Sequence, residues 1–310
     1  MICEFEEMWL QTNGIRLHVI QSGPVDGPLV VMLHGFPEFW YGWRHQIGPL
    51  AQAGFRVLVP DQRGYNLSDV PSPVSAYSLE QLARDVMGLV DGLGRKDCYL
   101  VGHDWGAAVA WYTALVFPDR IRKLAVLNVP HPRVMNDFLR KNPRQMLKSW
   151  YIGFFQIPGL ADWLVSRDQF SAGARSLVGS SRPNTFSPAE IAEYRQAWQN
   201  SKGMTGMINW YRALVRFPAR LPASPRLRMP VRILWGKQDA FLSVQMAEAS
   251  AQWCDRVEVI LFEEATHWVE HEEASAVANA LTVFFTDSAH HSAAEINSEN
   301  MVNDKMIAAK

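Results

Sequence analysis

Continuous apolar runs that end in a glycine or a polar residue constrain the fold of this chain more than any other feature. They occupy residues 29–35 (LVVMLHG), 55–61 (FRVLVPD) and 98–103 (CYLVGH). Runs of this length are typical of parallel strands that are buried on both faces. Residues 15–21 (IRLHVIQ) alternate instead, which predicts an edge or half-buried strand.

Helical patterns lie between these runs. In residues 78–94 (SLEQLARDVMGLVDGLG), Ser78 is the predicted N-cap, Gln81 holds the capping-box position and Gly94 is the predicted stop. Strands that alternate with helices indicate an α/β protein with a mostly parallel sheet. The 310 residues, 48% of them hydrophobic, are enough for one large core.

After residues 123–130 (KLAVLNVP) the pattern changes. Residues 130–225 are rich in aromatic residues, interrupted by prolines and without a strand pattern, which predicts a helical insertion. Strand patterns resume at 229–236 (MPVRILWG) and 257–263 (VEVILFE), so strands from both ends of the chain are expected to share one sheet.

These patterns divide the chain into three parts. Residues 1–129 and 226–286 are expected to form the α/β core, and residues 130–225 a cap over its sheet. Because open α/β sheets bind ligands at the carboxyl ends of their strands, the cleft between cap and sheet is the predicted site. The polar residues 287–310 are predicted to be a disordered tail.

Composition excludes several classes of function. Thirty Lys and Arg residues against 31 Asp and Glu residues give a net charge of -1, so no bulk field attracts nucleic acid or a membrane surface. The start, MICEFEEMWL, lacks the features of a signal peptide, and no apolar run reaches about 18 residues, so we expect a cytoplasmic protein without a membrane span. Cys3, Cys98 and Cys254 fit neither a disulfide framework nor a zinc site, and GHDWG is no phosphate-binding glycine motif; no metal or cofactor is expected.

Gly102, Asp104 and Gly106 fit the pattern G-x-nucleophile-x-G, in which a strand bends sharply into a helix and exposes the central side chain. This pattern makes Asp104 a candidate nucleophile. Asp is also a common N-cap, and on this motif alone both interpretations stay open.

An acid and a histidine follow Asp104 in the chain order that this fold uses. Asp239 comes after the predicted strand 229–236, and His267 after 257–263. Taken singly, Asp239 could be a solvated turn residue and His267 a helix cap. Their joint placement at the carboxyl edge of the sheet favours a catalytic triad with Asp104.

Residues 33–43 (LHGFPEFWYGW) supply the last expected part. The backbone N–H groups of Phe36 and Trp105 are predicted to form an oxyanion hole. Pro37 restricts Phe36 and fixes the loop. His34 beside it is interpreted as structural.

An aspartate nucleophile restricts the reaction. With an ordinary pKa of about 3.9, Asp104 is ionised at neutral pH and needs no base. Its attack on an sp³ carbon gives an alkyl ester, which water must then hydrolyse. His267, held by Asp239, would activate that water. Epoxides and alkyl halides both suit this scheme.

The cap distinguishes the two substrate classes, because an epoxide oxygen needs a proton donor such as a neutral phenol. Tyr151, Tyr194 and Tyr211 lie in the predicted cap, and composition does not choose among them.

Four strings together, HGFPE, GHDWG, the Tyr four residues before FQIPG, and NWYR, resemble the soluble epoxide hydrolases of the α/β-hydrolase superfamily. The resemblance covers roughly residues 10–285. It implies that Asp104 is the nucleophile, that Asp239 and His267 form the charge pair, and that Tyr151 and Tyr211 donate to the epoxide oxygen. Tyr194 has no counterpart and is interpreted as packing.

Three alternative functions share part of this pattern. Haloalkane dehalogenases are similar at GHDWG and use the Trp after the nucleophile to hold halide, a role open to Trp105, but the paired tyrosines argue against it. Fluoroacetate dehalogenases are similar at HGFP but carry an Arg where Trp105 stands. A binding protein without turnover is disfavoured by the complete triad.

The predicted substrate is a small apolar epoxide, which reacts with water. Its expected contacts are Phe36, Trp105, Trp150, Phe155 and Trp210, and Phe154, Trp163 and Phe241 are further candidates for the lining of an apolar tunnel. Whether the protein is a monomer or a homodimer stays open.

Overall fold

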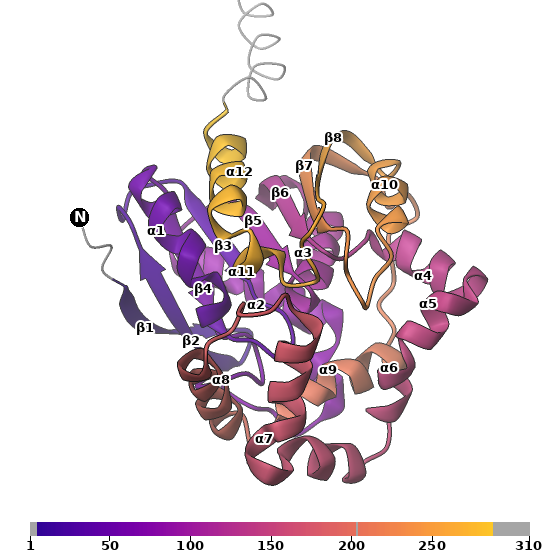
Figure 1. The fold of residues 1–310 in the computed structure, drawn as a ribbon. Coiled ribbons are helices and arrows are strands. Elements are labelled where there is room, and N and C mark those ends of the chain that lie inside the picture. The colour runs from indigo at the N-terminus through magenta and orange to yellow at the C-terminus, as the bar shows by residue number, and fades with distance from the viewer. Residues whose placement is uncertain (1–4, 203, 288–310) are drawn as a thin grey trace, which may run out of the picture.

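A computed structural model describes residues 5–202 and 204–287 (Figure 1). Its centre is an eight-stranded sheet with the order β1-β2-β4-β3-β5-β6-β7-β8. The strands β1 and β2 run antiparallel to their neighbours, and the remaining pairs are parallel. The strands are β1 Glu6–Thr12, β2 Ile15–Ser22, β3 Leu29–Leu33, β4 Arg56–Pro60, β5 Cys98–His103, β6 Ile121–Leu127, β7 Leu227–Gly236 and β8 Cys254–Phe262.

Helices cover both faces of the sheet, which explains the continuous apolar strands. In β3, Val30 and Met32 pack into a core with α1 and α12, whereas Val31 and Leu33 pack into a core with α2, α3 and α10. Every residue of β3 is buried. The helices are α1 Arg44–Gln52, α2 Leu79–Gly92, α3 Trp105–Val116, α10 Gln245–Ala251, α11 Val269–Glu272 and α12 Ala274–Thr286, with short 3-10 turns η1 Trp40–Trp43, η2 Val74–Tyr77 and η3 Pro118–Arg120.

Between β6 and β7 the chain forms a group of helices that lies together at one side of the sheet (Figure 1). They are α4 Pro132–Lys141, α5 Pro143–Lys148, α6 Trp150–Phe154, α7 Leu160–Ser180, α8 Pro188–Asn200 and α9 Thr205–Arg216. No strand occurs among the described residues of this segment. The helix α7 is interrupted by non-helical backbone at Arg167, Asp168, Gln169 and Phe170.

Side chains of these cap helices bind loops that follow the strands. The indole of Trp198 in α8 donates to the carbonyl of Pro37, at 2.5 Å, and that of Trp210 in α9 donates to the carbonyl of Arg63, at 2.9 Å. These carbonyls belong to the loops after β3 and β4. The cap therefore lies over the carboxyl ends of the strands.

The structure corrects several local predictions. The strand β1 is absent from the sequence interpretation because its residues are mostly exposed, and its pairing makes β2 an internal strand. The predicted capping box is wrong: Ser78 is the N-cap of α2, but its side chain makes no capping hydrogen bond. Gln81 instead accepts a hydrogen bond from Asn13 at 2.9 Å. The helix ends at Gly92, and Gly94 follows with a positive φ of 65°.

Two further expectations concern the limits of the chain. Of the predicted tail, residues 288–310 lie outside the described residues. Within the described part of the chain, every helix is too short or too polar to cross a bilayer.

Candidate active site

Asp104 stands at a sharp elbow between β5 and α3. Its φ of 47° and ψ of -123° are rare for a residue with a side chain. The neighbouring glycines make the bend possible: a Cβ on Gly102 would lie 2.3 Å from the carbonyl oxygen of Gly106, and one on Gly106 would lie 2.1 Å from that of Leu33. Asp104 is the N-cap of α3 by position, but its side chain makes no capping hydrogen bond, so capping does not explain the carboxylate.

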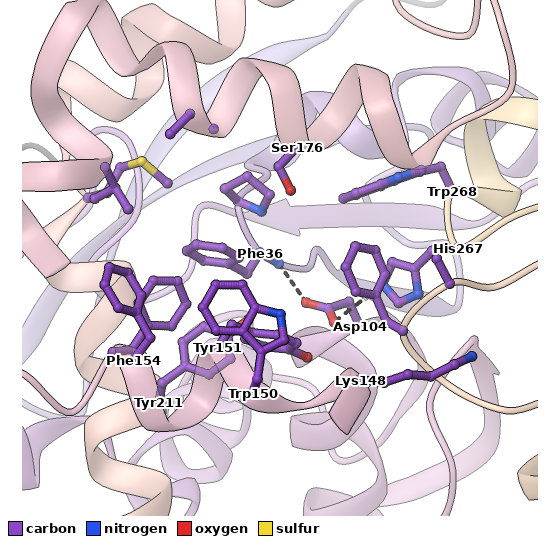
Figure 2. A pocket seen from close by; sticks show the side chains of 18 of the residues that line it. Phe36, Asp104, Lys148, Trp150, Tyr151, Phe154, Ser176, Tyr211, His267 and Trp268 are labelled. Carbon is purple, nitrogen blue, oxygen red and sulfur yellow. Dashed lines mark hydrogen bonds and ion pairs between the residues drawn. The ribbon is translucent and has the colours of Figure 1, made fainter. Parts of the chain in front are cut away.

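The carboxylate of Asp104 faces two groups across the elbow (Figure 2). Its Oδ1 accepts a hydrogen bond from the backbone N–H of Phe36 at 2.8 Å. Its Oδ2 lies 3.4 Å from Nε2 of His267. Gly35 permits this approach, because a Cβ there would lie 2.4 Å from Cβ of Asp104. The Phe36–Pro37 peptide bond is cis.

His267 and Asp239 form a buried pair. Nδ1 of His267 lies 2.8 Å from Oδ2 of Asp239. The other carboxylate oxygen of Asp239 accepts hydrogen bonds from the backbone N–H groups of Phe241 and Leu242, at 2.7 and 2.9 Å. These contacts fix the carboxylate, and the carboxylate in turn orients the imidazole ring.

Sequence reasoning missed Asn128, which supports this pair. Its side-chain amide donates to Oδ2 of Asp239 at 2.8 Å, and its own oxygen accepts from the N–H of Gly236 at 3.0 Å. Asn128 follows β6 directly, at the same carboxyl edge that holds the other site residues. That position is the signal that could have identified it.

The charges of the site shift its pKa values. Burial alone would raise the pKa of Asp104, but the hydrogen bond and charge of His267 outweigh it, and the pKa is lowered. Burial lowers the pKa of His267, but the charge of Asp239 and the hydrogen bond to Asp104 prevail and raise it to about 9. In Asp239 the charge of His267 likewise overcomes burial and lowers the pKa. The resting site at neutral pH therefore holds two carboxylates around one imidazolium.

Tyr151 of α6 and Tyr211 of α9 lie side by side in the cap, with ring centroids 5.7 Å apart. Tyr211 also contacts Phe36 and Trp105, at 5.2 and 5.0 Å between centroids. Burial and the charge of Asp104 raise the pKa of both phenols, and in Tyr211 a hydrogen bond with the Trp105 side chain acts in the opposite direction. Both phenols are therefore protonated and available as donors at neutral pH.

Asp104, Tyr151 and Tyr211 border two cavities. The larger, of about 610 Å³, is shown in Figure 2. The smaller has about 270 Å³ and lies on the side of Trp105. The apolar walls of the larger cavity include Phe36, Trp150, Phe154, Phe155 and Phe241.

Two expected lining residues lie elsewhere. The prediction that Trp210 contacts substrate is wrong: it is fully buried, donates its indole N–H to the Arg63 carbonyl, and packs against Trp105 with 5.6 Å between centroids. Trp163 borders neither cavity and is 59% exposed.

A buried polar cluster adjoins His267 and was also missed. Nδ1 of His103 lies 2.8 Å from Glu270 and 3.2 Å from Glu38, and its Nε2 lies 2.9 Å from the carbonyl oxygen of His267. Burial lowers the pKa of His103, but the two carboxylates outweigh burial and raise it well above its ordinary value. Tyr194 donates to Glu38 at 2.8 Å, so it packs in the cap and also belongs to this cluster.

The same cluster is the candidate for a metal among the described residues, because ligand atoms of Glu38, Glu270 and His271 lie within 4.8 Å of one another. Its hydrogen bonds oppose that use. Arg44 donates to Nδ1 of His271 at 3.1 Å, so the proton of the ring lies on Nε2, which donates to Glu38 at 2.7 Å. The nitrogen that would bind an ion is occupied by a proton, and we assign no metal here.

A strand-to-helix elbow after β5, an acid after β7 and a histidine after β8, on a mostly parallel sheet with a cap, define the α/β-hydrolase fold. The family described as "alpha/beta hydrolase fold" matches residues 28–274. The chain is 41% identical over 276 residues to the "AB hydrolase superfamily protein YfhM" of Bacillus subtilis (strain 168), covering 89% of this chain and 94% of that protein.

Two further relatives are more specific. Identity to "Epoxide hydrolase A" of Mycobacterium tuberculosis is 33% over 319 residues, covering 90% of this chain and 97% of that one. A crystal structure of Bacillus megaterium epoxide hydrolase in complex with an inhibitor superposes with a TM-score of 0.82 at 32% identity, covering 90% of this chain and all of that one (100%). The chain belongs to the epoxide hydrolase family of the α/β-hydrolases.

Proposed function

We propose that this protein hydrolyses an apolar epoxide to a vicinal diol through a covalent alkyl ester on Asp104. The observation that carries the proposal is the position of two protonated phenols, Tyr151 and Tyr211, on the same cavities as the Asp104 carboxylate. Membership in the epoxide hydrolase family supports the substrate class. Phe36, Trp150 and Phe155 give the substrate apolar walls.

In the first step the free oxygen of Asp104 attacks a ring carbon of the epoxide. Oδ1 is held by the Phe36 amide, which leaves Oδ2 as the nucleophile. The C–O bond of the ring breaks, and its electron pair goes to the oxygen, which takes a proton from Tyr151 or Tyr211. A general acid of this kind accelerates a reaction by about a hundred- to ten-thousandfold.

The ester then changes the electrostatics at His267. The Asp104 carboxylate helps to keep the pKa of His267 raised in the resting site. Esterification removes that negative charge, so the pKa of His267 falls. The ring gives up its proton, and the phenolate left by the first step takes one up, so both the neutral base and the neutral tyrosine are restored. The ring can then act as the base in the second step.

In that step His267 takes a proton from water, and the hydroxide attacks the acyl carbon of Asp104. Negative charge develops on Oδ1, where the Phe36 amide donates and the Trp105 amide is assigned as the second donor. Collapse expels the diol oxygen, which takes the proton from His267. Asp104 is left as a carboxylic acid, and its proton passes to the neutral His267, which restores the carboxylate and the imidazolium of the resting site.

A His267→Gln variant tests the proposal, because it retains the nucleophile and lacks the base. On incubation with styrene oxide, the peptide that contains Asp104 should gain the mass of one epoxide and keep it. Absence of that mass gain in the folded variant would refute the proposal. The matched control is Asp104→Asn in the same background, which should gain no mass.

The dehalogenase alternative depends on Trp105 as a halide donor. The indole of Trp105 instead packs edge-to-face against the ring of Tyr211, with 5.0 Å between centroids. Halide release from bromoalkanes without diol formation from styrene oxide would favour that alternative.

A further inference from the structure

Glu272, at the end of α11, carries a fully buried carboxylate, with 0% of its side chain exposed. Oε2 accepts a hydrogen bond from the backbone N–H of Thr266 at 2.6 Å. Oε1 accepts one from the hydroxyl of Thr266 at 2.8 Å and one from the backbone N–H of Arg182 at 2.7 Å. The hydroxyl of Thr185 is a fourth donor, 3.5 Å from Oε1. Four donors thus converge on one carboxylate that belongs neither to the triad nor to the cluster around His103.

The donors come from two different parts of the protein, the histidine loop and the cap. Thr266 immediately precedes His267, so the two hydrogen bonds that Thr266 donates hold the chain at the residue before the histidine. Arg182 lies in the cap, between α7 and α8. Its guanidinium Nε is 3.6 Å from Oε2 of Glu272, and its Nη1 is 2.9 Å from Glu273. Glu272 therefore connects the cap to the histidine loop.

We propose that Glu272 is a positioning residue that holds His267 in place for ester hydrolysis and ties its loop to the cap through Arg182. The proposal rests on the proposed function. A buried carboxylate keeps its place when its donors are present, and a buried donor left without an acceptor is costly. A displacement of about 1 Å in a reacting group can cost about a hundredfold in rate.

The two steps of the proposed reaction respond differently to Glu272. Alkylation uses the Asp104 carboxylate and the cap phenols, whereas hydrolysis alone needs His267 as the base. A change at Glu272 should therefore slow hydrolysis selectively. In a two-step reaction kcat/KM is set by alkylation, so kcat and KM should fall together while kcat/KM stays constant when hydrolysis limits turnover.

The test compares Glu272→Gln with Glu263→Gln, an exposed glutamate that is paired with Lys237 at 2.8 Å. The new amide presents N–H donors where the carboxylate accepted, so at least one of these hydrogen bonds is lost. Stopped-flow tryptophan fluorescence with excess styrene oxide separates alkylation from hydrolysis. Glu272→Gln should slow hydrolysis by about ten- to a hundredfold, leave alkylation unchanged and accumulate the alkyl ester, and Glu263→Gln should match the wild type.

Arg182→Ala tests the connection to the cap. It removes the guanidinium contacts, and hydrolysis should again fall with alkylation unchanged. Equal slowing of both steps in Glu272→Gln, or no slowing of hydrolysis, would overturn the positioning role. Unaltered hydrolysis in Arg182→Ala would overturn the part of the tie that the Arg182 guanidinium makes, since the backbone N–H of residue 182 still donates to Glu272. If His267→Gln acquires no epoxide mass on Asp104, the proposed function fails instead, so the two failures are distinguishable.

Discussion

Nε2 of His267 lies 3.4 Å from Oδ2 of Asp104, so the proposed base and the proposed nucleophile share a charge contact in the resting site. On the far side of the ring, Nδ1 contacts Asp239 at 2.8 Å. Two carboxylates around one ring raise the pKa of His267 to about 9 although the ring is buried. The proposed cycle depends on this charge contact, because the contact is lost when Asp104 becomes an ester and the pKa of His267 then falls.

Removing the charge of Asp104 should lower the pKa of His267. In Asp104→Asn one of the two carboxylates becomes a neutral amide, whereas the burial of His267 and the charge of Asp239 remain. The sign follows directly: at pH 8 His267 is mainly protonated in the wild type, and a larger fraction is neutral in the variant. Histidine NMR titration measures the shift. Asp119→Asn, an exposed change, should leave the pKa at about 9, and an equal value in Asp104→Asn would contradict the electrostatic argument.

Loss of both cap phenols should slow alkylation and spare hydrolysis. The double variant Tyr151→Phe, Tyr211→Phe removes the proposed general acids, which are worth about a hundred- to ten-thousandfold. Each single variant should lose less, because the other phenol remains. Single-turnover fluorescence with excess enzyme gives the alkylation rate.

Tyr194→Phe is the matched control for this prediction, since it changes a third cap tyrosine. It should leave alkylation unchanged but lower the free energy of unfolding by about 1–3 kcal/mol, because buried Glu38 loses a donor at 2.8 Å. Urea unfolding measures that change. Normal alkylation in the double variant would remove the tyrosines from the proposed mechanism.

The oxygen of water should enter Asp104 before it enters product. In a single turnover in H₂¹⁸O, the attack on the acyl carbon puts ¹⁸O into the Asp104 carboxylate and leaves the diol unlabelled. Mass spectrometry of the Asp104 peptide and of the diol tests this directly. Label in the diol of the first turnover would indicate direct attack of water on the epoxide.

The elbow should tolerate no added methyl group. In Gly106→Ala the new Cβ would lie 2.1 Å from the backbone oxygen of Leu33, so strand β3 or helix α3 must move. Overpacking of this kind costs about 1–3 kcal/mol of unfolding free energy. Gly92→Ala, where no atom lies within 4 Å, should instead stabilise by about 0.5–1 kcal/mol, because alanine favours the helix. Urea unfolding of both variants gives the comparison, and equal stabilities would contradict it.

Features set by local chemistry were readable from the sequence. The strands β3, β4 and β5 are buried on both faces, so their apolar runs are continuous. The elbow needs glycine at two positions because backbone atoms approach closely there. Asp239 and His267 were identifiable because each follows a parallel strand, and parallel strands present their carboxyl ends at one edge.

Features that depend on contacts between residues far apart in the sequence could not be predicted from it. Trp210 and Tyr211 are adjacent in α9, about 100° apart around the helix axis, so one turns to the Arg63 loop and the other to the cavity. The spacing of residues in the sequence does not reveal which part of the protein each face of the helix contacts. Ser78 and Gln81 have the pattern of a capping box, but Asn13 takes the Gln81 side chain.

The sequence by itself thus determined the buried parallel strands, the elbow and the order of the three triad candidates, because these depend on burial, backbone geometry and chain direction. Only the tertiary structure decided which side chains hold the triad candidates in place. Asn128 meets Asp239 across 111 positions, and Glu272 meets Arg182 across 90. Such contacts depend on how β6, the cap and the histidine loop pack together. The position of Asn128 after a strand places it at the carboxyl edge of the sheet but does not identify its partner.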